Sequence, residues 1–140
     1  MPGPHLIIYS EAEELANRLT HGIAALLSVV GLVVLLLAAS RTGDPYRIVS
    51  SAVFCSVLIL FYIISTLYHT FRNQRVRYVF RILDHAGIFL VIAASYTPFT
   101  LVSLREGNGW ALFGVVWGLA IVGTVFKTFM THRLAFLAPV

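Results

Sequence analysis

Two short patterns in this sequence place chemically reactive side chains at helical spacing. Ser65 and His69 are four residues apart, so on a helix they share one face. Glu14, Asn17 and His21 follow the spacing i, i+3 and i+7, which also defines a single helix face. Hydroxyl, imidazole and carboxylate groups gathered in this way are the components of acid–base, nucleophilic or metal-dependent chemistry.

Asp84 is a further candidate, because it follows His69 across a basic segment and opens the next apolar stretch. A carboxylate inside a membrane span usually pairs with a cation, binds an ion or lies on a substrate route. The simplest alternative is an ion pair with Arg81, which lies three residues earlier on the same helix face. For His21 and His85, a structural role is favoured over a metal-binding one.

Imidazole and carboxylate groups on facing helices suit a metal ion such as zinc. A catalytic zinc ion usually has three protein ligands and one open position, which holds water. The metal lowers the pKa of that water and so supplies hydroxide as a nucleophile. A serine beside the metal can hydrogen-bond the water or a developing oxyanion. The residues alone leave this interpretation open against a purely interfacial placement of the same side chains.

Four apolar runs must position these groups, because about 20 apolar residues span a bilayer as a helix. They cover residues 22–40, 48–68, 82–104 and 110–130. The chain is 59% hydrophobic and only 11% charged, whereas a soluble domain carries about 25% charged residues. We therefore expect an all-α, polytopic transmembrane helix bundle over residues 21–140. Residues 1–20 should form a cytoplasmic segment with a short amphipathic helix that begins near residue 11.

The distribution of lysine and arginine predicts the orientation of the spans. Seven of these residues lie on the side of the N-terminus, four of them in a basic link expected at residues 70–81, and three lie on the other side. This bias places the N-terminus in the cytoplasm and the chain in the plasma membrane. The net charge of +4 is then a topology signal, and we expect the lipid bilayer, not nucleic acid, as partner.

In this topology the polar residues at membrane depth collect at one end of the bundle. They are Glu14, Asn17, Thr20 and His21, then Ser65, Tyr68 and His69, then Asp84 and His85, and finally Lys127, Thr128 and His132. At other positions, Pro98 predicts a kink in the third span. Gly114 and Gly118 match the GxxxG motif for close helix approach.

These motifs, in this order, resemble those of the hemolysin III family, the bacterial relatives of the progestin and adiponectin receptors. The resemblance runs from about Glu13 to the end and rests on three sequences. They are Glu14-x-x-Asn17-x-x-Thr20-His21, Ser65-x-x-x-His69, and Leu83-Asp84-His85-Ala86-Gly87, which Tyr96-Thr97-Pro98 follows. That family belongs to a wider set of membrane proteins that includes alkaline ceramidases.

The resemblance implies a seven-helix bundle that holds zinc near its cytoplasmic side. His69 would be a zinc ligand, and Asp84 and Ser65 would act catalytically beside the metal or its water. The remaining ligands of the family come from a His-x-x-x-His pair on the seventh helix. This sequence has about four of the seven spans and no such pair. We therefore expect a truncated member, whose site is incomplete or is completed by missing C-terminal helices or by self-association.

Three functions follow from this resemblance. The first is zinc-dependent hydrolysis of a lipid amide or ester. The second is membrane perturbation or pore formation, although the polar residues gather at one end and do not form a stripe along the spans. The third is a non-catalytic, receptor-like or structural role in the membrane.

Overall fold

The computed structural model describes the backbone of residues 9–137 and the side chains of residues 9–130. This part of the chain contains no strand, which confirms the expected all-α class. Its elements are α1 (Glu11–Ser40), α2 (Pro45–Thr70), α3 (Gln74–Pro98), the π-helix η1 (Phe99–Ser103) and α4 (Gly109–Leu137). α1, α2, α4 and the continuous stretch of α3 with η1 are each long and apolar enough to cross a bilayer. The chain is therefore built as a multi-pass membrane protein.

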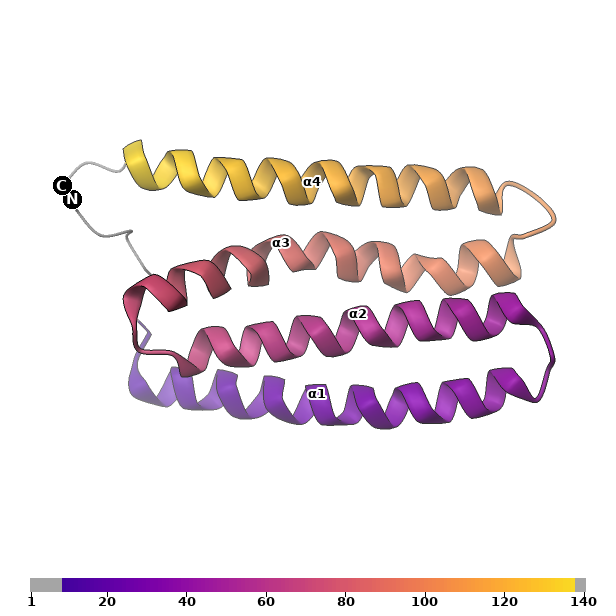
Figure 1. The fold of residues 1–140 in the computed structure, drawn as a ribbon, viewed down its shortest axis with the longest axis horizontal. Helices are drawn as coiled ribbons and strands as arrows, with labels where there is room; N and C mark the ends of the chain where they lie inside the picture. Colours follow the sequence, from indigo (N-terminus) through magenta and orange to yellow (C-terminus); the bar gives the residue numbers. More distant parts are fainter. Residues whose placement is uncertain (1–8, 138–140) are drawn as a thin grey trace.

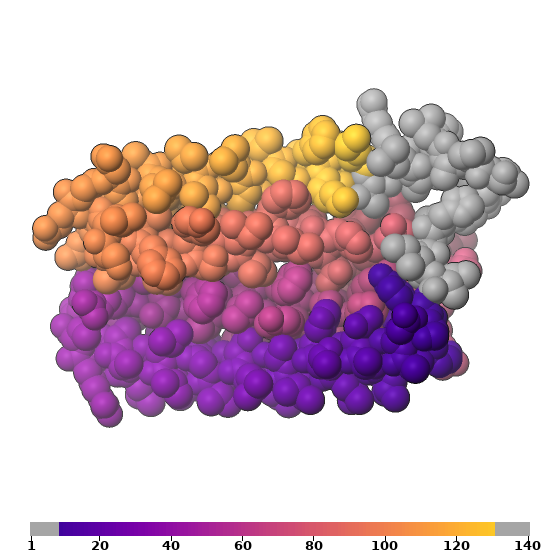
Figure 2. Space-filling view, turned by 180° about the vertical axis from the view of Figure 1, so that it is seen from behind, coloured from indigo at the N-terminus to yellow at the C-terminus, as the bar shows by residue number. Residues whose placement is uncertain are grey.

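The four long helices lie side by side in chain order and alternate in direction (Figure 1). Among the described residues, the backbone of each long helix packs closely only against its neighbours in the chain, so α1 and α3 meet only through long side chains. The view from behind shows the same order, with α1 along one edge and α4 along the other (Figure 2). The helices thus form an open row, and the start of α1 lies at the same end as the end of α4 (Figure 1).

Side-chain caps set where the helices begin. Ser10 and Glu13 form a capping box, in which the Ser10 Oγ accepts a bond from the Glu13 backbone N–H and the Glu13 carboxylate accepts one from the Ser10 N–H. α1 then runs without interruption to Ser40. Asp44 caps α2 by accepting a hydrogen bond from the Tyr46 N–H, and Pro45 occupies the first turn, where its missing N–H costs nothing.

The basic segment before the third span is helical, so the prediction of a link at residues 70–81 is wrong. Asn73 ends the connection because its side-chain oxygen accepts hydrogen bonds from the backbone N–H groups of Arg75 and Val76. α3 consequently starts at Gln74, and the following arginines project from its first turns. This early start fixes the direction of Arg77, which enters the site described below.

The regular α-helix changes at Pro98, where a kink was predicted. η1 follows directly, and a π-helical turn widens the helix locally. The Thr100 hydroxyl donates to the carbonyl oxygens of Tyr96 and Thr97, both at 3.1 Å. The Trp117 indole N–H donates to the Thr97 hydroxyl at 3.0 Å and so ties α4 to this irregular part of α3.

The close contact between α3 and α4 occurs at Gly123. A Cβ added to Gly123 would lie 2.8 Å from Cδ1 of Phe89, so the phenyl ring occupies the space that any larger residue would need. The predicted GxxxG pair behaves differently, because Cβ atoms at Gly114 and Gly118 would meet no atom within 4 Å. Within the described chain, the GxxxG motif is therefore not the packing contact.

Candidate functional site

Polar side chains from three helices meet at the end of the row where α1 begins, α2 ends and α3 begins. We call Glu14, His21, Ser65, His69 and Arg77 the polar cluster. Two of its hydrogen bonds join α1 to α2, and one ion pair joins α1 to α3. The i, i+4 spacing of Ser65 and His69 therefore has the predicted effect, since both side chains face α1.

Glu14 is the centre of the polar cluster. Its Oε2 lies 2.7 Å from Nδ1 of His69, and its Oε1 accepts a hydrogen bond from the Arg77 guanidinium. The two side chains of the His69–Glu14 pair are only 7% and 14% exposed. Because a carboxylate can only accept when ionised, His69 donates its Nδ1–H to Glu14. The Nε2 atom is thereby left as the ring position that can take a metal or a proton.

A second imidazole lies next to the first. Nδ1 of His21 is 2.6 Å from the Oγ of Ser65, which is itself only 1% exposed. The His21 and His69 rings are in edge contact, with centroids 5.9 Å apart. The serine hydroxyl is therefore held by a histidine of another helix, and the two imidazoles belong to one continuous group.

Asp84 lies on α3, next to His85. Its Oδ1 is buried and has no hydrogen-bond partner, and its Oδ2 is 3.7 Å from Nδ1 of His85. That His85 nitrogen donates to the carbonyl oxygen of Arg81 at 2.8 Å, as in an ordinary helix contact. An unpartnered buried carboxylate oxygen is costly, and it marks a position where a water or ion would be stabilised.

Tyr68 connects Asp84's helix to the polar cluster. Its ring centroid is 4.6 Å from that of His69 and 6.5 Å from that of His85. The Arg77 guanidinium lies over the same ring, 5.3 Å from its centroid, while the hydroxyl makes no hydrogen bond. Tyr68 therefore contacts both His69 of the polar cluster and His85, the neighbour of Asp84, so the two groups of side chains adjoin at this ring.

No three histidine, cysteine, aspartate or glutamate side chains are grouped to hold a metal ion, as far as residues 9–130 show. His69 and Asp84 therefore do not form a complete metal centre by themselves. His132, which the sequence placed at the same end, lies where the side chains are outside the described part of the chain.

Sequence reasoning missed the roles of Glu14 and Arg77. Arg77 was counted only as a topology signal in a basic link. The available signal was the spacing of Glu14 with His21, since a carboxylate on a membrane helix face needs a cationic or hydrogen-bonding partner. The partner could be assigned only after α3 was known to begin before Arg77.

Comparisons with known proteins agree with the motifs. A family profile described as Haemolysin-III related matches residues 9–138. Hemolysin-3 of Bacillus cereus is 44% identical over 121 residues, covering 86% of this chain and 55% of that protein. The Hemolysin-3 homolog of Bacillus subtilis (strain 168) is 39% identical over 131 residues, covering 94% and 62%. The chain thus spans less than two thirds of either relative. No solved structure matches it.

Proposed function

The chain belongs to the haemolysin-III-related family, and we propose from this premise that its polar end is one side of a zinc-dependent hydrolytic site for a lipid amide or ester. The observation that carries the proposal is the hydrogen bond between Glu14 and His69. Metal-binding histidines commonly donate their second ring N–H to a carboxylate, which fixes the tautomer and the ring orientation. Glu14 does this for Nδ1 of His69 and directs Nε2 as the candidate ligand atom.

The described side chains fit one side of such a site and do not complete it. His69 would supply a nitrogen ligand, and the unpartnered Oδ1 of Asp84 would be free to interact with the attacking water. Further ligands must then come from outside the described residues, either from additional helices or from another copy of the chain. When bound, zinc would supply a hydroxide near neutral pH and polarise a substrate carbonyl.

The protein side chains have separate roles in this proposal. Glu14 orients His69, and Arg77 pairs with the other oxygen of the Glu14 carboxylate and so holds that carboxylate in place. Asp84 can accept a proton from an attacking water through its free oxygen. The Ser65 hydroxyl, held at 2.6 Å by His21, can donate to a developing oxyanion. In this proposal, the end of the row lies where the carbonyl groups of lipids meet the bilayer surface.

We also propose that the chain lies in the cell membrane with this polar end on the cytoplasmic side. Seven of the ten lysines and arginines belong to that side of the expected topology, as the positive-inside rule requires. A cysteine-accessibility assay that labels a residue near the start of α1 only after cell lysis would support this orientation, and labelling of intact cells would contradict it.

Zinc content of the purified chain in mild detergent tests the metal proposal. We expect zinc to remain with the wild type and with His85→Ala and to be lost from His69→Ala. His85 is the matched control because it lies outside the polar cluster, with its Nδ1 bonded to a backbone carbonyl of its own helix instead of to the Glu14 carboxylate. Equal, non-zero zinc content in the wild type and His69→Ala would overturn the proposal that His69 binds the metal, and no zinc in either would exclude completion of the site by a second copy of this chain.

Turnover of fluorescent lipid amides and esters tests the hydrolytic step. Asp84→Asn should reduce turnover by about 100-fold or more, the usual contribution of a positioned acid–base group, while zinc content stays unchanged. Full activity in Asp84→Asn would exclude Asp84 from the reaction.

A second candidate is membrane lysis, which the names of the two relatives suggest. Release of a dye from liposomes separates it from hydrolysis. Leakage that is equal for the wild type and for His69→Ala would favour lysis that is independent of the polar cluster, whereas no leakage at matched protein dose would remove this candidate.

A further inference from the structure

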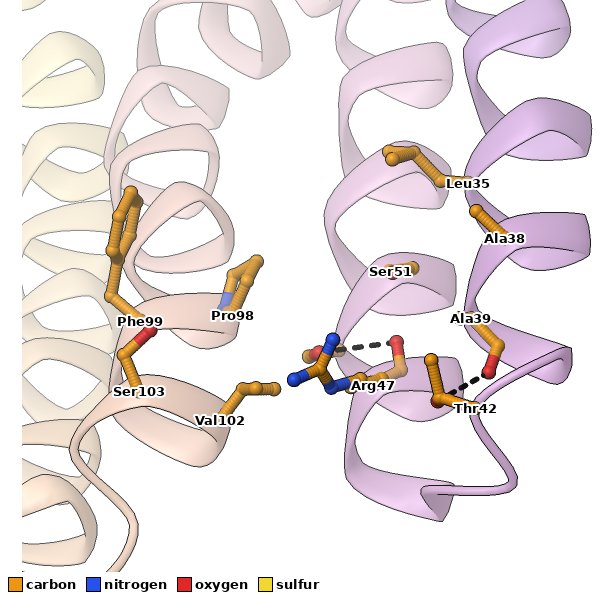
Figure 3. Close-up of a pocket in the computed structure, with 11 residues that line it drawn as sticks. Leu35, Ala38, Ala39, Thr42, Arg47, Ser51, Pro98, Phe99, Val102 and Ser103 are labelled. Atoms are coloured by element: carbon orange, nitrogen blue, oxygen red, sulfur yellow. Dashed lines mark hydrogen bonds between the residues drawn. The ribbon is translucent and has the colours of Figure 1, made fainter.

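A separate cavity lies at the end of the row opposite the polar cluster. It has a volume of about 290 Å³ and opens between the end of α1, the start of α2, and η1 (Figure 3). α2 forms its floor, where Ser50 is buried and donates to the backbone carbonyl of Arg47. The cavity therefore lies in a groove on one face of the row, between α1 and η1, whose backbones do not pack against each other.

Arg47 is the charged group of this cavity. Its side chain is 53% exposed, and its guanidinium points from α2 into the gap, toward Val102 on η1 (Figure 3). Its ion pair with Asp44 is long, with Nε 3.8 Å from Oδ2. Arg105 contacts the other oxygen of the same carboxylate at 3.2 Å. One carboxylate thus serves two arginines, so the mouth of the cavity keeps an excess of positive charge.

The cavity walls are polar at the mouth and apolar toward the middle of the spans. Arg47, Ser51 and Ser103 are among the polar residues that line it. Leu35 on α1 and Phe99 on η1 extend the lining toward the bilayer interior (Figure 3). Both apolar side chains are exposed, with 39% and 63% of their surfaces accessible. A ligand here would need an anionic head and a hydrocarbon tail.

The π-helix shapes the wall on the α3 side. η1 follows Pro98, and π-helical turns are frequent at functional sites because they displace side chains from the regular helix register. In this chain they carry Phe99, Val102 and Ser103 to the cavity. The irregular segment therefore contributes one hydroxyl and two apolar contacts to the same groove that holds Arg47.

We propose that this cavity binds an anionic phospholipid. Its phosphate pairs with the Arg47 guanidinium, whose planar N–H groups suit phosphate oxygens, and its acyl chain lies against Leu35, Phe99 and Val102. The inference does not depend on the zinc site, because the cavity lies at the other end of the helices.

Native mass spectrometry of the detergent-purified chain tests this site with equal amounts of phosphatidylglycerol and phosphatidylcholine. We expect the wild type to retain phosphatidylglycerol about fivefold more than phosphatidylcholine, the effect of one cation near the membrane surface. Arg47→Gln should remove this preference. Arg41→Gln is the matched control, because Arg41 is exposed at the same end but does not line the cavity, and it should leave the preference unchanged.

Two additional measurements keep the test decisive. Val102→Phe narrows the apolar wall without changing charge, so it should reduce retention of both lipids. Arg47→Lys keeps the positive charge but loses the planar guanidinium group, so its preference for phosphatidylglycerol should be intermediate. It replaces Arg47→Gln as the test variant if Arg47→Gln does not fold. Equal losses in Arg41→Gln and Arg47→Gln would overturn the proposal in favour of general surface charge. Displacement of the lipid by an equal concentration of inorganic phosphate would overturn the requirement for an acyl chain.

Discussion

The Glu14 carboxylate on α1 lies 2.7 Å from the His69 imidazole on α2, and its other oxygen pairs with Arg77 on α3. One acidic residue thus joins three helices at a single end of the row. Each of these side chains is largely buried. The contact is therefore both a structural joint and the device that fixes the imidazole tautomer.

The first prediction concerns the stability of this joint. Glu14→Gln removes the negative charge and leaves the largely buried guanidinium of Arg77 without its counter-ion. Breaking one partner of a buried ion pair is strongly destabilising, and we expect a loss of about 3 kcal/mol in the free energy of unfolding. Denaturant titration of the detergent-solubilised protein measures it.

Glu11→Gln is the matched control for this measurement. Glu11 also pairs with an arginine, Arg72, but the two side chains are 86% and 87% exposed. Exposed ion pairs contribute little to stability, so Glu11→Gln should leave the unfolding midpoint unchanged. Equal midpoints for Glu14→Gln and Glu11→Gln would contradict the role of Glu14 as a joint.

The second prediction concerns the protonation of His69. Because Nδ1 donates to Glu14, nitrogen-15 NMR of histidine-labelled protein in micelles without added metal should show a protonated Nδ1 and an unprotonated Nε2. His85, whose Nδ1 donates to the Arg81 carbonyl, should show the same tautomer. Glu14→Gln should perturb the His69 signals more strongly than the His85 signals. A proton on Nε2 of His69 would exclude that atom as a ready metal ligand.

The sequence predicted the helices well because crossing a bilayer demands long apolar runs, and their number and order follow directly. It failed at residues 70–81, where arginines were interpreted as a link. The helical start depended on Asn73, a capping residue whose effect is local and was overlooked. Because the start of α3 was not predicted, the pairing of Glu14 with Arg77 could not be predicted either.

The open arrangement of the row was beyond the sequence for a different reason. In a membrane, lipid-facing and helix-facing side chains are both apolar, so hydrophobic periodicity does not identify the packing face. Gly114 and Gly118 fit a recognised motif yet face open space, whereas the isolated Gly123 makes the close contact. Only the placement of Phe89 distinguishes these glycines.

The third prediction follows from that contact. Gly123→Ala would place a methyl group 2.8 Å from the Phe89 ring, so α3 and α4 must separate or the ring must move. Overpacking of this kind costs about 1–3 kcal/mol. Unfolding in detergent should show this loss for Gly123→Ala and none for Gly118→Ala. Adding Phe89→Leu to Gly123→Ala should recover part of the lost stability. If the effects of the two substitutions on the free energy of unfolding simply add, the proposed contact is contradicted.

The fourth prediction concerns the turn between η1 and α4. Gly109 is the first residue of α4, and a Cβ there would lie 2.5 Å from the carbonyl oxygen of Leu104 and closer still to that of Thr100. Both obstacles are backbone atoms, which cannot rotate away as a side chain can. Gly109→Ala should therefore displace the start of α4 together with its neighbour Trp110.

Tryptophan fluorescence in a Trp117→Phe background reports on this displacement, since Trp110 is then the remaining tryptophan. Its ring packs edge-on against Tyr46 of α2, with centroids 6.1 Å apart. Separation of Trp110 from Tyr46 should shift the Trp110 emission to longer wavelength, because the indole becomes exposed to water. Gly107→Ala is the matched control, because its Cβ would meet a backbone oxygen only at 3.8 Å. Identical spectra for the two variants would show that Gly109 is not required for space, and the α3–α4 turn would then have to tolerate a backbone shift without losing the Tyr46 contact.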